Sequence, residues 1–131
     1  MNSTHTHHLK RIVEDVAKDA EILALFLYGS NARAEACEQS DIDLCLVLMP
    51  ARYTSKELSQ KKLTYLKSFE LDIQIFQQLP IYIKKRVIKE GKVLYCKDDD
   101  ALYDLCFTVI REFADFEHIY RHYLAEVADA G

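Results

Sequence analysis

The sequence predicts a single domain that contains both α-helices and β-strands. Two observations carry this prediction: apolar residues recur with the helical period near both ends of the chain, and short runs of continuous or alternating apolar residues lie between them. The length of 131 residues, half of them hydrophobic, allows one core and leaves no room for a second folded domain. We expect this domain to span residues 9–131, after a flexible and polar N-terminal tail over residues 1–8.

The first half of the chain predicts one helix and two strands. A helix is expected from Leu9 to about Ala20, because its apolar residues fall on one face. Ile22–Tyr28 is a continuous apolar run, too short for a helix, and indicates a strand buried on both faces. After a polar stretch with at most a short helix, residues 41–48 alternate and predict a second strand. Asp41 and Asp43 share one face of that strand.

The second half predicts three helices and two further strands. Thr54 and Glu57 have the spacing of a capping box at the start of a helix that runs to about Phe69. Residues 69–76 alternate again and indicate a strand that carries Asp72 on its polar face. Pro80 and Gly91 bracket a helix, a short strand follows over residues 93–96, and a long helix extends over residues 100–128. Such a helix is longer than a small domain can cover, so part of its aromatic stripe is expected to meet another subunit.

Charge and composition argue against several classes of function. The net charge of −4 and the pI near 5.7 make nucleic-acid binding unlikely, because that function needs a broad basic face. A local group of basic residues is expected to be a solvated helix face; it comprises Lys84, Lys85, Arg86, Lys89 and Lys92. The four cysteines lack the spacing of a zinc site, and neither a signal peptide nor a membrane-spanning run is visible. A cytoplasmic protein without membrane contact is therefore expected.

The residues that carry chemistry gather between Tyr28 and Val47. Gly29 and Ser30 end one predicted strand, where a tight turn and the following amides suit a phosphate group. Asp41 and Asp43 begin the next strand and aim two carboxylates at one point. Carboxylates this close repel each other unless a cation lies between them, and Mg²⁺ is the oxygen-seeking ion for such a site. The pattern indicates phosphoryl-type transfer.

Taken together, these motifs resemble the minimal nucleotidyltransferases of the DNA polymerase β superfamily. The resemblance rests on Gly29-Ser30, on Arg33, on the run Ser40-Asp41-Ile42-Asp43-Leu44 and on Asp72 as a third acid on a later strand. It extends over nearly the whole chain, including residues 79–96 and the long terminal helix. One departure is Ala34, where members often have glycine after the arginine.

The resemblance implies an α+β fold with a mixed, twisted sheet, flanked by helices and ended by the long C-terminal helix. It also implies ATP as donor, bound with the help of Gly29, Ser30, Arg33 and Ser40, and two Mg²⁺ ions held by Asp41, Asp43 and Asp72. These three aspartates would be the catalytic residues, with Glu70 as the rival third acid. The reaction implied is transfer of AMP with release of pyrophosphate.

Three functions remain open at the level of sequence. The resemblance favours an antitoxin that adenylylates a tyrosine of a partner HEPN toxin; a homo-oligomer through the C-terminal helix is a further expectation. The alternatives are a transferase that modifies a small molecule such as an aminoglycoside, and an antitoxin that binds without catalysis. Arg111, His118 and Tyr120 approach the ribonuclease pattern of HEPN domains, but we interpret them as ordinary surface residues or as a partner contact, because that fold needs several more helices.

Overall fold

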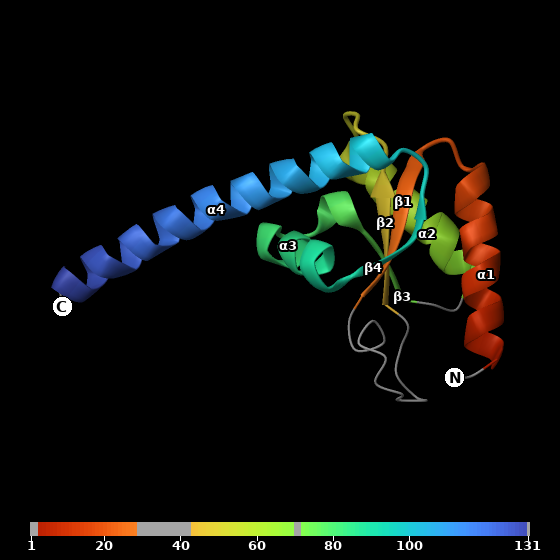
Figure 1. Cartoon of the computed structure of the whole chain (residues 1–131), viewed down its shortest axis with the longest axis horizontal. Coiled ribbons are helices and arrows are strands. Elements are labelled where there is room, and N and C mark those ends of the chain that lie inside the picture. Colours follow the sequence, from red (N-terminus) through yellow and green to blue (C-terminus); the bar gives the residue numbers. More distant parts are fainter. Residues whose placement is uncertain (1–2, 29–42, 70–71, 131) are drawn as a thin grey trace.

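The computed structural model describes residues 3–28, 43–69 and 72–130 (Figure 1). Its elements follow the predicted order: α1 (Ser3–Lys18), β1 (Ile22–Tyr28), β2 (Asp43–Leu48), α2 (Ser55–Ser68), β3 (Asp72–Ile75), the short 3-10 helix η2 (Phe76–Gln78), α3 (Ile81–Glu90), β4 (Lys92–Cys96) and α4 (Asp99–Ala130). The predicted α+β fold with a long C-terminal helix is therefore confirmed.

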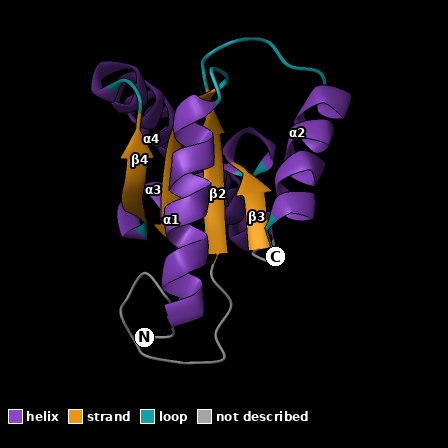
Figure 2. Cartoon of the chain, turned by 90° about the vertical axis from the view of Figure 1, so that its right-hand side faces the viewer, coloured by secondary structure: helices purple, strands orange, loops and turns teal. Residues whose placement is uncertain are grey.

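The four strands form one mixed sheet in the order β3-β2-β1-β4. β2 and β3 are parallel and are joined by α2, whereas β1 runs antiparallel to both of its neighbours, β2 and β4. Helices α1 and α2 lie on one side of the sheet, and α3 and α4 lie on the other (Figure 1). β3 is an edge strand with α2 beside it (Figure 2).

Two hydrophobic layers, one on each face of the sheet, make up the core. The layer under α1 and α2 contains Leu44, Leu46 and Leu48 of β2. The layer under α3 and α4 contains Cys45 and Val47 of the same strand. The alternation along β2 thus divides its side chains as predicted, and β1 is buried on both faces because it supplies residues to both layers.

Helix α2 starts at the capping box that the sequence predicts. The Thr54 hydroxyl accepts from the backbone N–H of Glu57 at 3.0 Å, and the Glu57 carboxylate accepts from the backbone N–H of Thr54 at 2.9 Å. The helix ends at Ser68, with Phe69 as its C-cap. Phe69 therefore belongs to the end of the helix, and β3 is shorter than the predicted strand over residues 69–76.

The first helix begins at Ser3, six positions earlier than Leu9, within the stretch for which we expected a tail. The apolar period could not predict this extension, because residues 3–8 contain no apolar side chain that would reveal a helix face. A helix that is already nucleated by its packed part extends at little further cost, since each added residue gains one hydrogen bond.

Gly91 ends α3 for a reason other than the left-handed backbone usually found at a helix C-cap. Its φ is −75° and its ψ is 159°, an extended conformation open to any residue. Space is the constraint, because a Cβ at this position would collide with the carbonyl oxygen of Val87 and lie 3.1 Å from the Phe26 ring. The glycine lets the chain turn from α3 directly into β4.

Candidate active site

The candidate site lies at one end of the sheet, where β2 and β3 begin. Asp43 and Asp72 are the first residues of these two parallel strands and are partners in their register. Ile73 and Leu44, which follow them, are buried in the layer under α1 and α2, so both aspartates belong to the opposite face, the face of α3 and α4. The structure thus brings together two of the predicted catalytic residues, one half-buried and the other exposed.

Tyr28 adds a phenol to this pair of carboxylates. It is the last residue of β1 and the antiparallel partner of Asp43, so Tyr28, Asp43 and Asp72 form a row across three neighbouring strands. Burial is the largest cause, and together with the nearby Cys45 thiol and the carboxylates of Asp43 and Asp72 it raises the pKa of Tyr28 to about 12. The phenol therefore keeps its proton at neutral pH and can act as a hydrogen-bond donor beside the carboxylates. We did not predict Tyr28 as a site residue, although its place directly before Gly29 was a usable signal.

The side chain of Asp72 accepts a hydrogen bond from another residue of the same strand, β3. Gln74 lies two positions further along β3 on the same face, and its Nε2 donates to Asp72 Oδ1 at 3.4 Å. The other end of the amide, Oε1, accepts from Lys62 Nζ of α2 at 3.1 Å. Neither residue was singled out from the sequence, because only the folded chain brings α2 to the edge of β3.

The basic group on and after α3 is only partly the solvated face that we expected. Lys84 and Lys85 are half-buried and lie over aromatic rings, with Lys84 Nζ 5.7 Å from the Phe76 centroid and Lys85 Nζ 4.1 Å from the Phe113 centroid. Lys84 is a cation on the carboxylate-bearing side of the sheet, near Cys45. The other members of the group, Arg86, Lys89 and Lys92, are exposed as expected.

The remaining predicted site residues lie outside the described residues. They are Gly29, Ser30, Arg33, Ser40 and Asp41, together with Glu70 and the short helix considered between residues 31 and 39. Tyr28 and Asp43, which flank residues 29–42, are paired across β1 and β2. The two residues that border the motif segment are thus neighbours in the sheet, and Asp43 is in turn the neighbour of Asp72.

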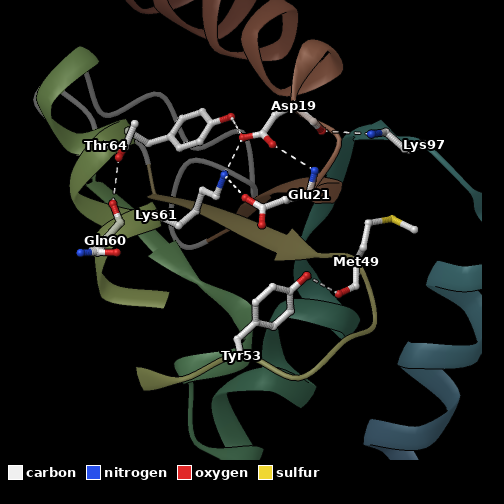
Figure 3. Close-up of polar contacts among 9 residues, drawn as sticks. Asp19, Glu21, Met49, Tyr53, Gln60, Lys61, Thr64 and Lys97 are labelled. Carbon is white, nitrogen blue, oxygen red and sulfur yellow. Dashed lines mark hydrogen bonds and ion pairs between the residues drawn. The ribbon is translucent and has the colours of Figure 1, made fainter. Parts of the chain in front are cut away.

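A separate polar cluster lies at the opposite end of β1. Lys61 of α2 lies between two carboxylates, 3.0 Å from Asp19 Oδ2 and 2.6 Å from Glu21 Oε1 (Figure 3). The Tyr65 hydroxyl also donates to Asp19 Oδ2, at 3.0 Å. These contacts tie the turn between α1 and β1 to α2. A cavity of about 240 Å³ beside them is lined by residues of this end, including Glu21, Tyr53 and Lys61.

In the part of the chain that the structure describes, no three His, Cys, Asp or Glu side chains are grouped in a way that could hold a metal ion. Asp41, the third member of the predicted ligand set, is not among those residues. In the same part of the chain, none of the helices combines the length and the apolar character needed to span a membrane.

A model of a known protein family matches most of the chain. The family model described as polymerase beta, nucleotidyltransferase, matches residues 10–100. This range begins within α1, contains the whole sheet and both aspartates, and stops at the start of α4.

A curated relative from Methanocaldococcus jannaschii is provisionally named a protein adenylyltransferase. It is 40% identical to this chain over 76 residues, which are 58% of this chain. The match spans 57% of the relative's own length.

Solved structures with the same fold include chains of toxin–antitoxin complexes. One, a toxin–antitoxin crystal structure with AMP-PNP, superposes with a TM-score of 0.65 and 15% identity, covering 91% of this chain and 97% of the other. Another, from Shewanella oneidensis, is a tri-AMPylated HEPN toxin in complex with an MNT antitoxin. It superposes with a TM-score of 0.62 and 14% identity, covering 93% and 97%. At these identities the similarity establishes the fold.

Proposed function

The chain belongs to the polymerase β nucleotidyltransferase family, and on that basis we propose that it transfers AMP from ATP to an acceptor hydroxyl. The observation that carries the proposal is the pairing of Asp43 with Asp72 at the start of two parallel strands. Both carboxylates belong to the face of the sheet opposite to Leu44 and Ile73, which pack under α1 and α2. They are suited to holding a cation against a polyphosphate.

Mg²⁺ fits the donor set of this site. Asp43 and Asp72 offer hard carboxylate oxygens from adjacent strands, and Asp41 precedes Asp43 by two positions on the predicted extension of β2. We propose that these three aspartates would hold the ion, or a pair of ions. Bound there, Mg²⁺ supplies charge neutralisation of the triphosphate and polarisation of the α-phosphoryl group.

The chain's own residues would divide the remaining work. Gly29, Ser30, Arg33 and Ser40 are proposed to bind the phosphates through backbone amides, hydroxyls and the guanidinium group. Asp72 is proposed to take the proton of the acceptor hydroxyl. The acceptor oxygen then forms a bond to the α-phosphorus, the bond from that phosphorus to the bridging oxygen breaks, and pyrophosphate leaves with the electron pair.

For the acceptor, we propose a tyrosine of a partner HEPN toxin, which would make this chain an antitoxin. The name of the M. jannaschii relative and the toxin–antitoxin complexes with the same fold support this choice. Helix α4 supports it independently. It extends well beyond the rest of the domain, on the side of the sheet that carries both aspartates (Figure 1).

The distal half of α4 has the composition of an interface. Its large apolar side chains are exposed; they include Phe116, Ile119, Tyr120, Tyr123, Leu124 and Val127. Aromatic residues in particular dominate the energetics of buried interface centres. A partner bound along this stripe would lie on the side of the catalytic carboxylates. A second copy of this chain is the other occupant to be tested.

The deciding experiment is a labelling reaction with [α-³²P]ATP and Mg²⁺ on the chain co-purified with a HEPN protein encoded beside it. The proposal expects label on a tyrosine of that protein, and no label from [γ-³²P]ATP. Label on an aminoglycoside, with none on the co-purified protein, would favour the small-molecule transferase. A stable complex without label on either would favour an antitoxin that binds without catalysis.

A further inference from the structure

The strongest unassigned feature of the site is a polar relay that ends on Asp72. Lys62 Nζ donates to Gln74 Oε1 at 3.1 Å, and Gln74 Nε2 donates to Asp72 Oδ1 at 3.4 Å. The relay thus joins helix α2, through one glutamine, to the carboxylate that we propose as the base.

The two partners determine the orientation of the Gln74 amide. An ammonium group can only donate hydrogen bonds, so Lys62 must face the amide oxygen. A carboxylate can only accept them, so the amide nitrogen must face Asp72. Because the flipped amide would lose both contacts, Lys62 keeps the donor end of Gln74 directed at Asp72.

The relay reaches the site around the edge of the sheet. α2 packs through Leu58, Tyr65 and Leu66 on the face opposite to the aspartates. β3 is the edge strand beside it (Figure 2), so Lys62 reaches Gln74 from that helix without passing through a core layer. Gln74 and Lys62 are half-buried, whereas Asp72 is exposed. An exposed carboxylate such as that of Asp72 can rotate more freely than half-buried groups. The relay therefore connects it to two side chains with less rotational freedom.

We infer that Gln74, oriented by Lys62, is a positioning residue that holds Oδ1 of Asp72 and leaves Oδ2 directed at the reactants. The inference rests on the proposed function of Asp72. Reactions of this kind depend on the placement of the base to within a fraction of an ångström. Loss of a side chain that orients a metal-binding or catalytic carboxylate typically lowers activity by about 10- to 100-fold.

The kinetic test compares Gln74→Glu, Gln74→Ala and Lys62→Met with the wild type. Gln74→Glu keeps the size of the side chain and its contact with Lys62, but it cannot donate to Asp72. For both Gln74 variants, kcat for AMP transfer should fall by about 10-fold or more. The KM for MgATP should stay within a factor of about two, because the proposed phosphate contacts and the other two proposed metal ligands, Asp41 and Asp43, are unchanged in these variants. Lys62→Met should lower kcat less, and adding it to Gln74→Ala should have little further effect, since both changes break one relay.

Gln78→Ala is the matched control. Gln78 also contacts α2, with Nε2 donating to Ser59 Oγ at 3.3 Å, but it lies in η2, beyond the far end of β3 from Asp72. The kcat of the Gln78→Ala variant should equal that of the wild type. If Gln74→Ala and Gln74→Glu also keep the wild-type kcat while the control is active, the positioning role is wrong.

A second measurement tests the relay without any reaction. In ¹H–¹⁵N spectra of the full chain, the side-chain amide resonances of Gln74 should shift in Asp72→Ala and in Lys62→Met, and those of Gln78 should not. Gln74 resonances that respond to neither change would overturn the inference. An inactive wild type would refute the proposed transfer, and the spectra would then decide on the relay alone.

Discussion

Asp43 and Asp72 are paired residues at the first positions of two neighbouring parallel strands, although 28 residues separate them in the chain. Their partner Tyr28 on β1 extends the pair into a row across three strands. The row lies at the end of the sheet where β1 ends and β2 begins, and residues 29–42, which include Gly29, Ser30 and Asp41, connect these two strands in the sequence.

ATP binding should depend on a divalent cation. The site combines at least two carboxylates with a polyphosphate, and only a cation relieves their repulsion. Calorimetry with MgCl₂ should detect binding of ATP, and the same titration in EDTA should show an affinity at least about 10-fold lower. Equal affinities under the two conditions would contradict the metal site.

Asp43→Asn should lower transfer by at least about 100-fold, because a lost metal ligand forfeits part of the several kcal/mol that the ion contributes. The fold should remain intact, since removing one of two neighbouring carboxylates relieves repulsion rather than disturbing a core. The melting temperature without Mg²⁺ should therefore be unchanged or higher. Asp104→Asn, an exposed aspartate on α4, is the control and should keep full activity. Wild-type activity in Asp43→Asn would assign the chemistry to other residues.

Asp72→Asn should still bind nucleotide but should transfer AMP about 100-fold more slowly or worse, the usual effect of losing a positioned base. Glu70→Gln provides the comparison, because Glu70 is the rival third acid. Single-turnover rates of AMP transfer, measured with saturating MgATP, show which of the two carboxylates is the base. An active Asp72→Asn together with an inactive Glu70→Gln would show that the rival is the base.

Exposed apolar residues of distal α4 should be needed for partner binding and not for nucleotide binding. Ile119 and Tyr123 are exposed and lie one turn apart on one face. Replacing both with serine should weaken binding to the HEPN partner by about 10-fold or more and leave the affinity for MgATP unchanged. Arg121→Ser, on the opposite side of the helix, should have little effect. Equal loss in the control would mean that the helix itself, and not the apolar stripe, was disturbed.

Asp19 should make stability depend on pH in the acid range. Burial raises the pKa of this carboxyl, but hydrogen bonds from Lys61, the Glu21 N–H and Tyr65 outweigh it and hold the pKa below 3.8. Because the folded pKa is depressed, the stabilisation is present above pH 3.8 and is lost as the pH falls through the folded pKa. Asp19→Ala should lower the free energy of unfolding at pH 7 by about 1–3 kcal/mol.

Urea titrations of wild type and Asp19→Ala at several pH values measure this effect. The difference between the two proteins should narrow as the pH falls below 3.8, where the wild-type carboxyl takes up its proton. A constant difference from pH 7 to the acid range would assign the loss to packing rather than to charge.

Most of the elements could be predicted from the sequence because their causes are local. The apolar run of β1 and the alternation along β2 reveal how each strand is buried, and the capping box marks the start of α2 to the residue. The Gly-Ser and Asp-x-Asp motifs predict a site for phosphoryl-type transfer, and they too are local patterns. Each of these signals is contained in a few neighbouring residues.

The tertiary structure alone decided how these elements meet. The register of β2 and β3 places Asp72 opposite Asp43, and pairing with β1 adds Tyr28 to them. The contact of Lys62 with Gln74 and the tight space at Gly91 depend in the same way on elements distant in the chain. Periodicity specifies the face of a strand, whereas register and neighbours are set by the packing of both faces of the whole sheet. Local sequence therefore determined which residues are candidates for the site, and long-range packing determined which of them lie side by side.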